Sequence, residues 1–476
     1  MTNSPPSRSG ALARAAAHFD SGALREDFAR RVAHRTESQR DDRESEQRAY
    51  LAQEVAPPLA GMGFSSRVVE NAVKADCPFM IAQRIEDERA PTILIYGHGD
   101  VVHGMDGRWA KARDPWTLSV EGDRWYGRGA ADNKGQHAIN FAALRQVFDE
   151  RGGKLGFNCK VLIESGEEAG SPGLREVAGA ERAALAADVL IASDGPRMTA
   201  ERPTVFLGSR GAVNFELIVD LREGAHHSGN WGGLLANPGT ILANAIASLV
   251  DGNGRILVDG LRPPAIPPAV RAAISDLSVG GGASDPHVDR DWGEPGLTSE
   301  ERVFGWNALE VLAFACGDPD APLNAVPAKA KATLQLRFVV GTSPTQVIPA
   351  VAAHLKREGF GRVVVRASRM EMFPATRLDP DNPWVAWSLA SIERSTGKRP
   401  ALLPNLGGSI PNDAFSDILG MPTIWIPHSY PACSQHAPDE HMLAPVAREG
   451  LAMMTGLYWD LGESGVEAVR AAKPQR

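Results

Sequence analysis

The sequence predicts an α/β protein of two domains, the second of which is inserted into the first. Short apolar runs typical of buried parallel strands alternate with helical stretches in both terminal parts of the chain. Between them, residues 208–372 combine strands of clean apolar–polar alternation with two helices, which is typical of an α+β sandwich. At 476 residues the chain also exceeds one typical domain. We therefore expect residues 1–207 and 373–476 to form one domain and residues 208–372 the other.

The first domain is expected to begin with helices. Residues 1–20 have the character of a flexible lead with a helical start, and Ser21 can cap a helix that runs to His34. A second helix is expected over residues 44–59, where two prolines end it. The later elements are expected as strands over residues 79–84, 92–96, 160–163, 188–192 and 422–426, and as helices over residues 136–148 and 383–395.

The inserted domain is expected to hold four strands and two helices, with a long loop rich in Pro and Gly. Gly208 and Gly211 flank its entry and can serve as a hinge, because glycine tolerates large backbone rotations. The strands are expected over residues 213–221, 309–314, 330–340 and 362–367, and the helices over residues 238–250 and 344–358.

Composition excludes several classes of protein. A net charge of −8 gives no reason to expect nucleic acid or an anionic membrane as a partner. The four cysteines have no Cys-x-x-Cys spacing, which argues against a disulfide framework or a thiolate zinc site and fits a reducing compartment. No apolar run approaches the length of a membrane span, and Arg14 interrupts the only apolar patch near the N-terminus. We expect a cytoplasmic protein.

The first candidate site residues follow the strand expected over residues 92–96. His98 and Asp100 stand where that strand ends, and the carboxyl ends of strands are where open α/β sheets hold ligands. His98 can supply a ring nitrogen to a metal while Asp100 holds the other ring N–H. A lone His-x-Asp pair is more often ordinary hydrogen bonding, so the remaining ligands must come from elsewhere. Asp132, which lies between glycine-rich turns, is the next candidate.

Two more expected strands end in carboxylates. Glu167 and Glu168 follow residues 160–163, and Asp194 follows residues 188–192. Adjacent carboxylates repel each other, so burying them costs free energy unless a cation compensates. On a solvated loop a Glu-Glu pair carries no meaning. Here the apolar strand before the pair and the glycines after it favour an inward placement, and three strand ends with metal-competent residues indicate one site.

The last candidate ligand is a histidine near the C-terminus. His428, His436 and His441 lie close together in the sequence, and position alone does not choose between them. The candidates amount to more ligands than one ion needs, and two ions about 3.5–4 Å apart, bridged by a carboxylate, would use them well. Mixed nitrogen and oxygen ligands without thiolate favour zinc, with manganese or cobalt as alternatives.

The order of the motifs resembles a known family. GHGDVV, GRGAADNKG, ESGEEAGS, SDG, HHSGNWGG, NAVP, GGSIP and SQHAPDE occur here in the order found in the di-zinc aminoacylase/carboxypeptidase family of peptidase clan MH. That family includes acetylornithine deacetylase, succinyl-diaminopimelate desuccinylase, aminoacylase, glutamate carboxypeptidase and the carnosine dipeptidases. The resemblance implies a three-layer, phosphorylase/hydrolase-like catalytic domain that carries an inserted, ferredoxin-like α+β domain acting as a lid and dimerisation domain.

The resemblance also implies a role for each candidate in the metal centre. Asp132 would bridge two ions, and the Asp132–Asn133 peptide would be cis. Glu167 would be the general base that takes a proton from the attacking water, and Asp100 would orient His98. The remaining ligands would be His98 and Asp194 at one ion and Glu168 and His436 at the other, since only His436 sits in the family's terminal motif.

In the inserted domain the resemblance implies residues that contact the substrate. His227 matches the histidine of the family's His-Ser-Gly motif, which reaches the partner subunit's site and stabilises the tetrahedral oxyanion. Asn324 matches a lid position that contacts substrate in the same way, and Arg337 stands where a lid arginine meets a substrate carboxylate. A surface arginine on a strand is the alternative for Arg337. Gly408 and Ser409 resemble the loop that holds the C-terminal side of the substrate.

Together these features predict a homodimeric di-metal amidohydrolase, a metallopeptidase that cleaves a dipeptide or N-acyl amino acid next to a free carboxylate. GGSIP and the long lid favour the dipeptidase branch. The alternative is an N-acetyl or N-succinyl amino acid deacylase of the acetylornithine or succinyl-diaminopimelate type. A catalytically inactive, metal-stabilised scaffold is a third interpretation, which the presence of Glu167 disfavours because a scaffold needs no unligated base.

Overall fold

The computed structural model describes residues 5–280, 286–368 and 372–472, and the chain divides into two units. The first unit comprises Met1–Gly208, Leu378–Leu403 and Pro411–Arg476. The second unit comprises Ser209–Arg377 together with the short segment Pro404–Ile410. The second unit thus interrupts the first, and a piece of the C-terminal part of the chain groups with it.

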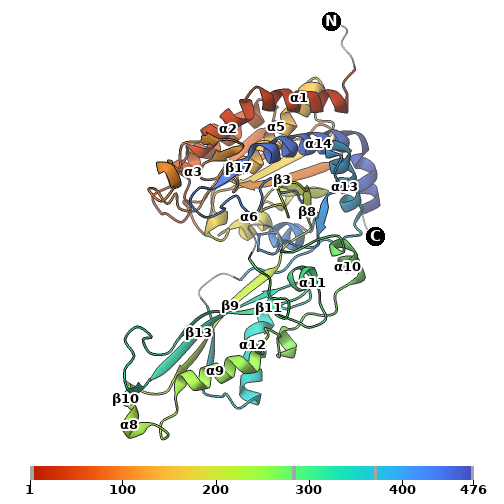
Figure 1. Ribbon diagram of the computed structural model, residues 1–476. Helices are drawn as coiled ribbons and strands as arrows, with labels where there is room; N and C mark the ends of the chain where they lie inside the picture. The colour runs from red at the N-terminus through yellow and green to blue at the C-terminus, as the bar shows by residue number, and fades with distance from the viewer. Residues whose placement is uncertain (1–4, 281–285, 369–371, 473–476) are drawn as a thin grey trace. The chain divides into compact units, whose positions relative to one another are not determined.

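The first unit is built on an eight-stranded mixed sheet, which confirms the α/β class (Figure 1). Its middle strands β6, β3, β7 and β16 run parallel, whereas β1 and β2 join one edge in antiparallel fashion and β16 pairs antiparallel with β8. Apolar β-branched runs buried on both faces explain why these segments form central strands. In spatial order the strands are β1 (Ser65–Val69), β2 (Phe79–Arg84), β6 (Asn158–Glu164), β3 (Thr92–His98), β7 (Val189–Ala192), β16 (Thr423–Trp425), β8 (Thr204–Phe206) and β15 (Ala401–Leu403).

A layer of helices packs on one face of this sheet (Figure 1). Helix α5 (Lys134–Glu150) lies at its centre and contacts the strand β3 as well as α1, α2 and α14. The other helices of this layer are α1 (Arg8–Asp20), α2 (Ala23–Val32), α3 (Glu44–Tyr50), α13 (Pro383–Thr396) and α14 (Ala444–Ala472). On the other face of the sheet, α6 (Leu174–Ala180) contacts a π-helical turn (Ala414–Ile418), and Phe415 of that turn packs edge-on against Tyr96 of β3.

Three elements at the ends of the chain differ from the sequence prediction. The expected flexible lead is the helix α1, whose buried residues Ala11 and Ala15 join the main core. The helix expected over residues 44–59 is broken by a π-helical stretch, Leu51–Val55, before the short helix α4 (Ala56–Ala60). The long helix α14 had no sequence prediction, although it packs on α5, α1 and α13.

The second unit contains a four-stranded antiparallel sheet in the order β11-β13-β9-β14. Two helices, α9 (Pro238–Leu249) and α12 (Pro344–Arg357), pack on it and bury the inward residues of β9 and β13. This agrees with the alternation that predicted an α+β sandwich. The strands are β9 (Gly211–Asp220), β11 (Ala308–Ala315), β13 (Lys329–Phe338) and β14 (Val364–Ala367), and the short pair β10 (His226–His227) and β12 (Ala325–Val326) stands apart from them.

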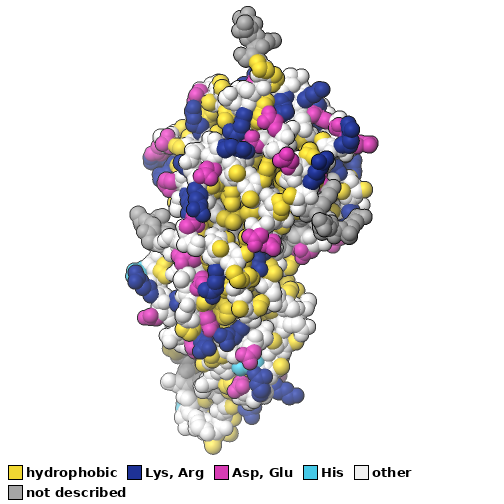
Figure 2. Space-filling view, turned by 90° about the vertical axis from the view of Figure 1, so that its right-hand side faces the viewer, with side chains coloured by type: hydrophobic (Ala, Val, Ile, Leu, Met, Phe, Trp, Pro, Cys, Tyr) yellow, Lys and Arg dark blue, Asp and Glu magenta, His cyan; other side chains and the backbone are white. Residues whose placement is uncertain are grey.

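The surface shows no field of a single charge on the face seen in Figure 2, where Lys and Arg side chains are interspersed with Asp and Glu. Among the helices of the described ranges, none combines the length and the apolar character that crossing a bilayer requires.

Candidate metal centre

The carboxyl ends of β3, β6 and β7 meet at one edge of the first unit's sheet because these three strands are parallel neighbours. His98 is the last residue of β3 and pairs with Glu164, the last residue of β6. The turn that follows β6 carries Glu167 and Glu168, and Asp194 follows β7. The topology therefore brings to one place the polar residues that end three separate apolar strands.

Asp132 lies at the centre of this group. It precedes helix α5, and each of its two carboxylate oxygens faces a different histidine. Oδ1 is 3.2 Å from Nε2 of His98, and Oδ2 is 2.8 Å from Nε2 of His436. His436 Nε2 also lies 3.1 Å from Oε2 of Glu168, and His98 Nε2 lies 3.8 Å from Oδ2 of Asp194. Such an arrangement would suit a carboxylate that bridges two metal ions.

The chemistry of this donor set fits divalent cations. One ligand atom each from His98, Asp132 and Glu168 falls within a mutual distance of 4.8 Å. Burial and the Asp132 charge raise the pKa of Glu168 to about 8, and the same two causes raise the pKa of Asp194 to about 6. Among the described residues, Oε1 of Glu168 is buried without a hydrogen-bond partner. Burying several carboxylates close together costs free energy, which bound cations would offset.

Asp100 connects two of the ligand-bearing segments. It is fully buried, and its Oδ1 and Oδ2 accept hydrogen bonds from the backbone N–H groups of Glu167 and Glu168 at 3.1 and 3.0 Å. Nδ1 of His98 lies 3.1 Å from the carbonyl oxygen of Asp100 and 3.4 Å from its Oδ1. Since both oxygens only accept, Nδ1 of His98 carries the proton and Nε2 is left to bind a metal.

The structure distinguishes between the three C-terminal histidines. His428 is buried against Oγ of Ser193, at 3.0 Å, and His441 Nε2 contacts the hydroxyl of Tyr430 at 2.6 Å. Within the described residues, only His436 of the three contacts the Asp132 carboxylate.

The sequence prediction missed a buried ion pair that holds the loop before Asp132. Oε1 of Glu440 accepts hydrogen bonds from the backbone N–H groups of Gly129, Ala131 and Asp132, at 3.0–3.1 Å. Its Oε2 accepts from Nη1 of Arg128 at 2.7 Å, and both side chains are almost fully buried. The two residues are 312 positions apart, so their only sequence signal was an arginine and an acid in two separate motifs. The Asp132–Asn133 peptide is cis, as the resemblance implied.

The candidate substrate-binding residues belong to the second unit. His227 ends β10 and pairs with Ala325 of β12, next to Asn324, whose carbonyl accepts from the Ser228 N–H at 2.9 Å. Arg337 of β13 donates through Nη1 to Oγ of Ser409 at 2.9 Å. The structure thus brings His227 beside Asn324, and Arg337 beside Ser409 and its neighbour Gly408.

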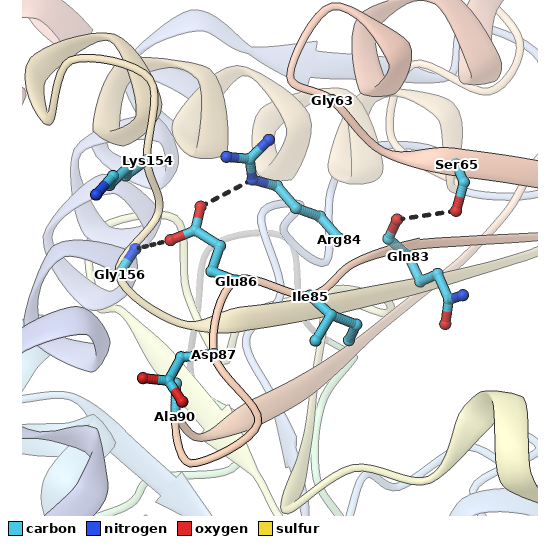
Figure 3. Close-up of a pocket in the computed structure, with 10 residues that line it drawn as sticks. All are labelled: Gly63, Ser65, Gln83, Arg84, Ile85, Glu86, Asp87, Ala90, Lys154 and Gly156. Atoms are coloured by element: carbon cyan, nitrogen blue, oxygen red, sulfur yellow. Dashed lines mark hydrogen bonds and ion pairs between the residues drawn. The ribbon is translucent and has the colours of Figure 1, made fainter.

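A hollow of 710 Å³ lies at the opposite end of the first unit's sheet (Figure 3). Arg84, which lines it, pairs with Cys159 at the start of β6, whereas His98 pairs with Glu164 at its end. The polar groups of the hollow bond to each other: Nε of Arg84 donates to Oε1 of Glu86 at 2.8 Å, and Oε2 of Glu86 accepts from the Gly156 N–H at 2.9 Å. The hollow is separate from the metal centre.

Comparison with known proteins identifies the family of this chain. The chain matches the sequence model of peptidase family M20/M25/M40 over residues 94–460. It is 30% identical over 334 residues to a cysteinylglycine-S-conjugate dipeptidase of Corynebacterium striatum, covering 68% of this chain and 70% of that protein. It is 28% identical over 362 residues to a β-Ala-His dipeptidase of Mus musculus, covering 70% and 69% of the two chains.

A solved structure has the same fold over most of its length. An M20 family metallo-carboxypeptidase from Sulfolobus solfataricus superposes with a TM-score of 0.75 at 24% identity, covering 92% of this chain and 99% of that one. The fold agrees with the sequence match, and the chain therefore belongs to peptidase family M20/M25/M40. It is a metal-dependent hydrolase, as the resemblance implied.

Proposed function

We propose that this protein is a di-metal dipeptidase that hydrolyses the amide bond of a dipeptide with a free C-terminal carboxylate. The observation that carries the proposal is the Asp132 carboxylate, which turns one oxygen to His98 and the other to His436. Membership of the peptidase family and the dipeptidase relatives support the same reaction.

The residues that would hold two ions are those grouped around Asp132. Nitrogen and oxygen donors without thiolate favour Zn²⁺, with Mn²⁺ or Co²⁺ as alternatives. Bound ions of this kind lower the pKa of water and polarise a carbonyl group. The proposed ligands are His98, Asp132, Glu168, Asp194 and His436.

Glu167 is the proposed general base. It lies on the same turn as Glu168, with its Oε2 3.9 Å from Nε2 of His98. Burial raises the pKa of Glu167 well above its usual value, and the charges of Asp194 and Glu168 add to this effect. A carboxylate with a raised pKa is a stronger base, so Glu167 can take a proton from the attacking water and pass it to the leaving amine.

Arg337 and Ser409 are proposed to bind the substrate carboxylate, with Gly408 in the same loop. Arg337 donates to two uncharged oxygens, Oγ of Ser409 and Oε1 of Gln335, at 2.9 and 3.0 Å. No carboxylate among the described residues forms an ion pair with Arg337, so its charge is available to a ligand. Arginine binds carboxylates in a bidentate, charge-assisted geometry, which suits a substrate with a free terminus.

A homodimer is proposed as the working form, with His227 and Asn324 acting at the partner subunit's site. The edge strand β11 supports a partner, because Val311, Leu312 and Phe314 are 43%, 53% and 46% exposed on it. Long apolar edge strands are otherwise a liability for aggregation. A cytoplasmic location is proposed on the four free cysteines.

The experiment that tests the function is a hydrolysis screen with Zn²⁺, Mn²⁺ and Co²⁺. Dipeptides with free and amidated C-termini are compared with N-acetyl and N-succinyl amino acids. We expect the dipeptides with a free carboxylate to be hydrolysed fastest and chelation to abolish the activity. Preferential hydrolysis of the N-acyl amino acids would replace the dipeptidase with the deacylase of the acetylornithine or succinyl-diaminopimelate type.

A further inference from the structure

Helix α5 presents a polar face to the interior of the first unit. Asn133, Gln136, His137 and Asn140 recur at the spacing of one helical face, and all four are fully buried. Buried polar groups are costly unless they are hydrogen-bonded, so a face of this kind requires a partner for each group. The face packs against the segments that carry His98 and Asp194.

Asn133 ties these segments together. Its Nδ2 donates to the carbonyl oxygen of Ser193, the residue before Asp194, at 2.7 Å. Its Oδ1 accepts from the backbone N–H of His98 at 3.4 Å and from Nδ1 of His137 at 3.3 Å. One amide therefore spans the ends of β3 and β7 and lies directly beside Asp132.

The orientation of that amide is fixed by a chain of hydrogen bonds that runs in one direction. The chain begins at Arg31, whose Nη1 lies 3.2 Å from the hydroxyl oxygen of Tyr50. A guanidinium only donates, so the Tyr50 hydroxyl accepts this bond and directs its own proton to Nε2 of His137, at 2.6 Å. Nδ1 of His137 then carries the ring proton and donates to Asn133. The chain ends at the carbonyl of Ser193, which only accepts.

The charge state of the imidazole agrees with this direction. Burial lowers the pKa of His137 well below its usual value, and the Arg31 charge lowers it further. A neutral imidazole has one N–H, and the tautomer present is set by the hydrogen bond that the other nitrogen receives. The hydroxyl of Tyr50 therefore favours the tautomer of His137 that carries its proton on Nδ1, the ring nitrogen next to Asn133.

We propose that Tyr50 and His137 are positioning residues of the metal centre, which hold the Asn133 amide in the orientation that joins the His98 and Asp194 segments. The proposal rests on the proposed function, since it assumes that these segments carry metal ligands. Without the Tyr50 hydroxyl, His137 can place its proton on Nε2 and turn a lone pair toward the Asn133 oxygen. The lone pair on Nδ1 of His137 then repels Oδ1 of Asn133. Asn133 no longer holds the ends of β3 and β7 together.

The test measures the affinity of the metal-free protein for Zn²⁺ by competition with a chromophoric chelator. We expect Tyr50→Phe to bind Zn²⁺ about 10-fold or more weakly, the range typical of partners behind the ligands of a metal. Tyr458→Phe is the matched control, because the buried Tyr458 hydroxyl donates to Oδ1 of Asn140 on the same helix face at 2.7 Å. Asn140 donates to Oγ of Ser193, a hydroxyl that can either accept or donate, so loss of the Tyr458 bond leaves Asn133 joined to the His98 and Asp194 segments, and this variant should keep the wild-type affinity.

A conservative rescue separates tautomer control from loosening of the core. In His137→Asn the amide nitrogen takes the place of Nδ1 and donates to Asn133 without help from Tyr50. Tyr50→Phe should therefore have no further effect on Zn²⁺ affinity when His137→Asn is present, whereas His137→Leu should weaken binding. If Tyr50→Phe does not fold, the comparison of the Asn and Leu variants at position 137 tests the proposal alone.

The outcomes are distinct. Wild-type affinity in Tyr50→Phe, an equal loss in Tyr458→Phe, or equal affinities in His137→Asn and His137→Leu would overturn the proposal. Because binding of Zn²⁺ is measured without substrate, a wild-type protein that binds metal but hydrolyses no dipeptide would contradict the proposed function and leave this comparison intact.

Discussion

At the scale of single residues, the proposal gives different roles to the groups that would hold metal and to the group that would move protons. Nε2 of His436 lies 2.8 Å from Asp132 and 3.1 Å from Glu168, and Oε2 of Glu167 lies 3.9 Å from Nε2 of His98. Burial and neighbouring charges raise the pKa of Glu167. Because Glu167 is not one of the proposed metal ligands, it can gain and lose a proton without breaking a bond to a metal ion.

Glu167→Gln tests this division of roles. The variant should still bind two divalent ions per chain, because the amide keeps the shape of the side chain and the five proposed ligands are untouched. Its kcat should fall by about 10²–10⁴-fold, the usual contribution of a general base. Metal content is measured by elemental analysis and kcat by dipeptide hydrolysis, with the exposed Glu88→Gln as the control. Near wild-type turnover would remove Glu167 from the reaction.

Arg337→Ala tests recognition of the substrate carboxylate. Loss of a charge-assisted pair is worth about 1.5–3 kcal/mol, so kcat/KM for a dipeptide with a free C-terminus should fall by about 10- to 150-fold. The same dipeptide with an amidated C-terminus is the control, and it should be a poor substrate that loses little more in the variant. Equal losses on both substrates would show that Arg337 acts only through Ser409 and the packing of β13.

At the scale of elements, one carboxylate joins three helices of the first unit. Asp460 of α14 accepts from Nε of Arg8 in α1 at 2.9 Å, from Oγ of Ser391 in α13 at 2.6 Å, and from Nη2 of Arg394 in α13 at 2.7 Å. Asp460 is only 5% exposed. This contact explains why the N-terminal segment is an ordered helix on the core.

Asp460→Asn should therefore lower the free energy of unfolding by about 1.5–3 kcal/mol, the usual value of hydrogen bonds to a charged group. The control is Asp20→Asn, which removes a solvent-exposed pair with Arg448 and should change the stability little, because water screens the pair. Both values come from urea denaturation. A loss in Asp460→Asn no larger than that of the control would mean that apolar packing alone docks α1.

At the scale of the whole molecule, the dimer proposal predicts that the active site is shared. His227 belongs to the second unit, whereas every proposed metal ligand belongs to the first. If His227 serves the partner's site, chains carrying His227→Ala and Glu167→Gln are each inactive but together form one intact site per mixed dimer. By two-fold symmetry, the mixed dimer should show about half the wild-type rate.

The measurement uses co-expression with two different tags and isolation of the doubly tagged dimer. Each single variant, purified in the same way, provides the background rate. An inactive protein that is confirmed to be a mixed dimer would place His227 in its own subunit's site or outside the reaction. A monomer in solution would contradict the homodimer itself.

The sequence by itself determined the class of the fold and the candidates for the metal centre. Strands such as β3 and β6 are short apolar runs bounded by turn residues. This pattern is local, so it can be read from the sequence. The ligand candidates were visible because each strand ends in a polar residue, and the resemblance of the ordered motifs supplied their roles. Those roles remain predictions, while the family and the α/β class are confirmed.

Only the tertiary structure decided which distant groups meet. It placed His436 against Asp132, as the resemblance implied, paired Glu440 with Arg128, and packed α1 as a helix on the core. It also aligned Tyr50, His137 and Asn133 behind the ligands. The physical reason is the same in each case. A buried polar group is stabilised by the partner that the folded chain brings within hydrogen-bond distance, and that partner can lie hundreds of residues away, so the local sequence does not predict it.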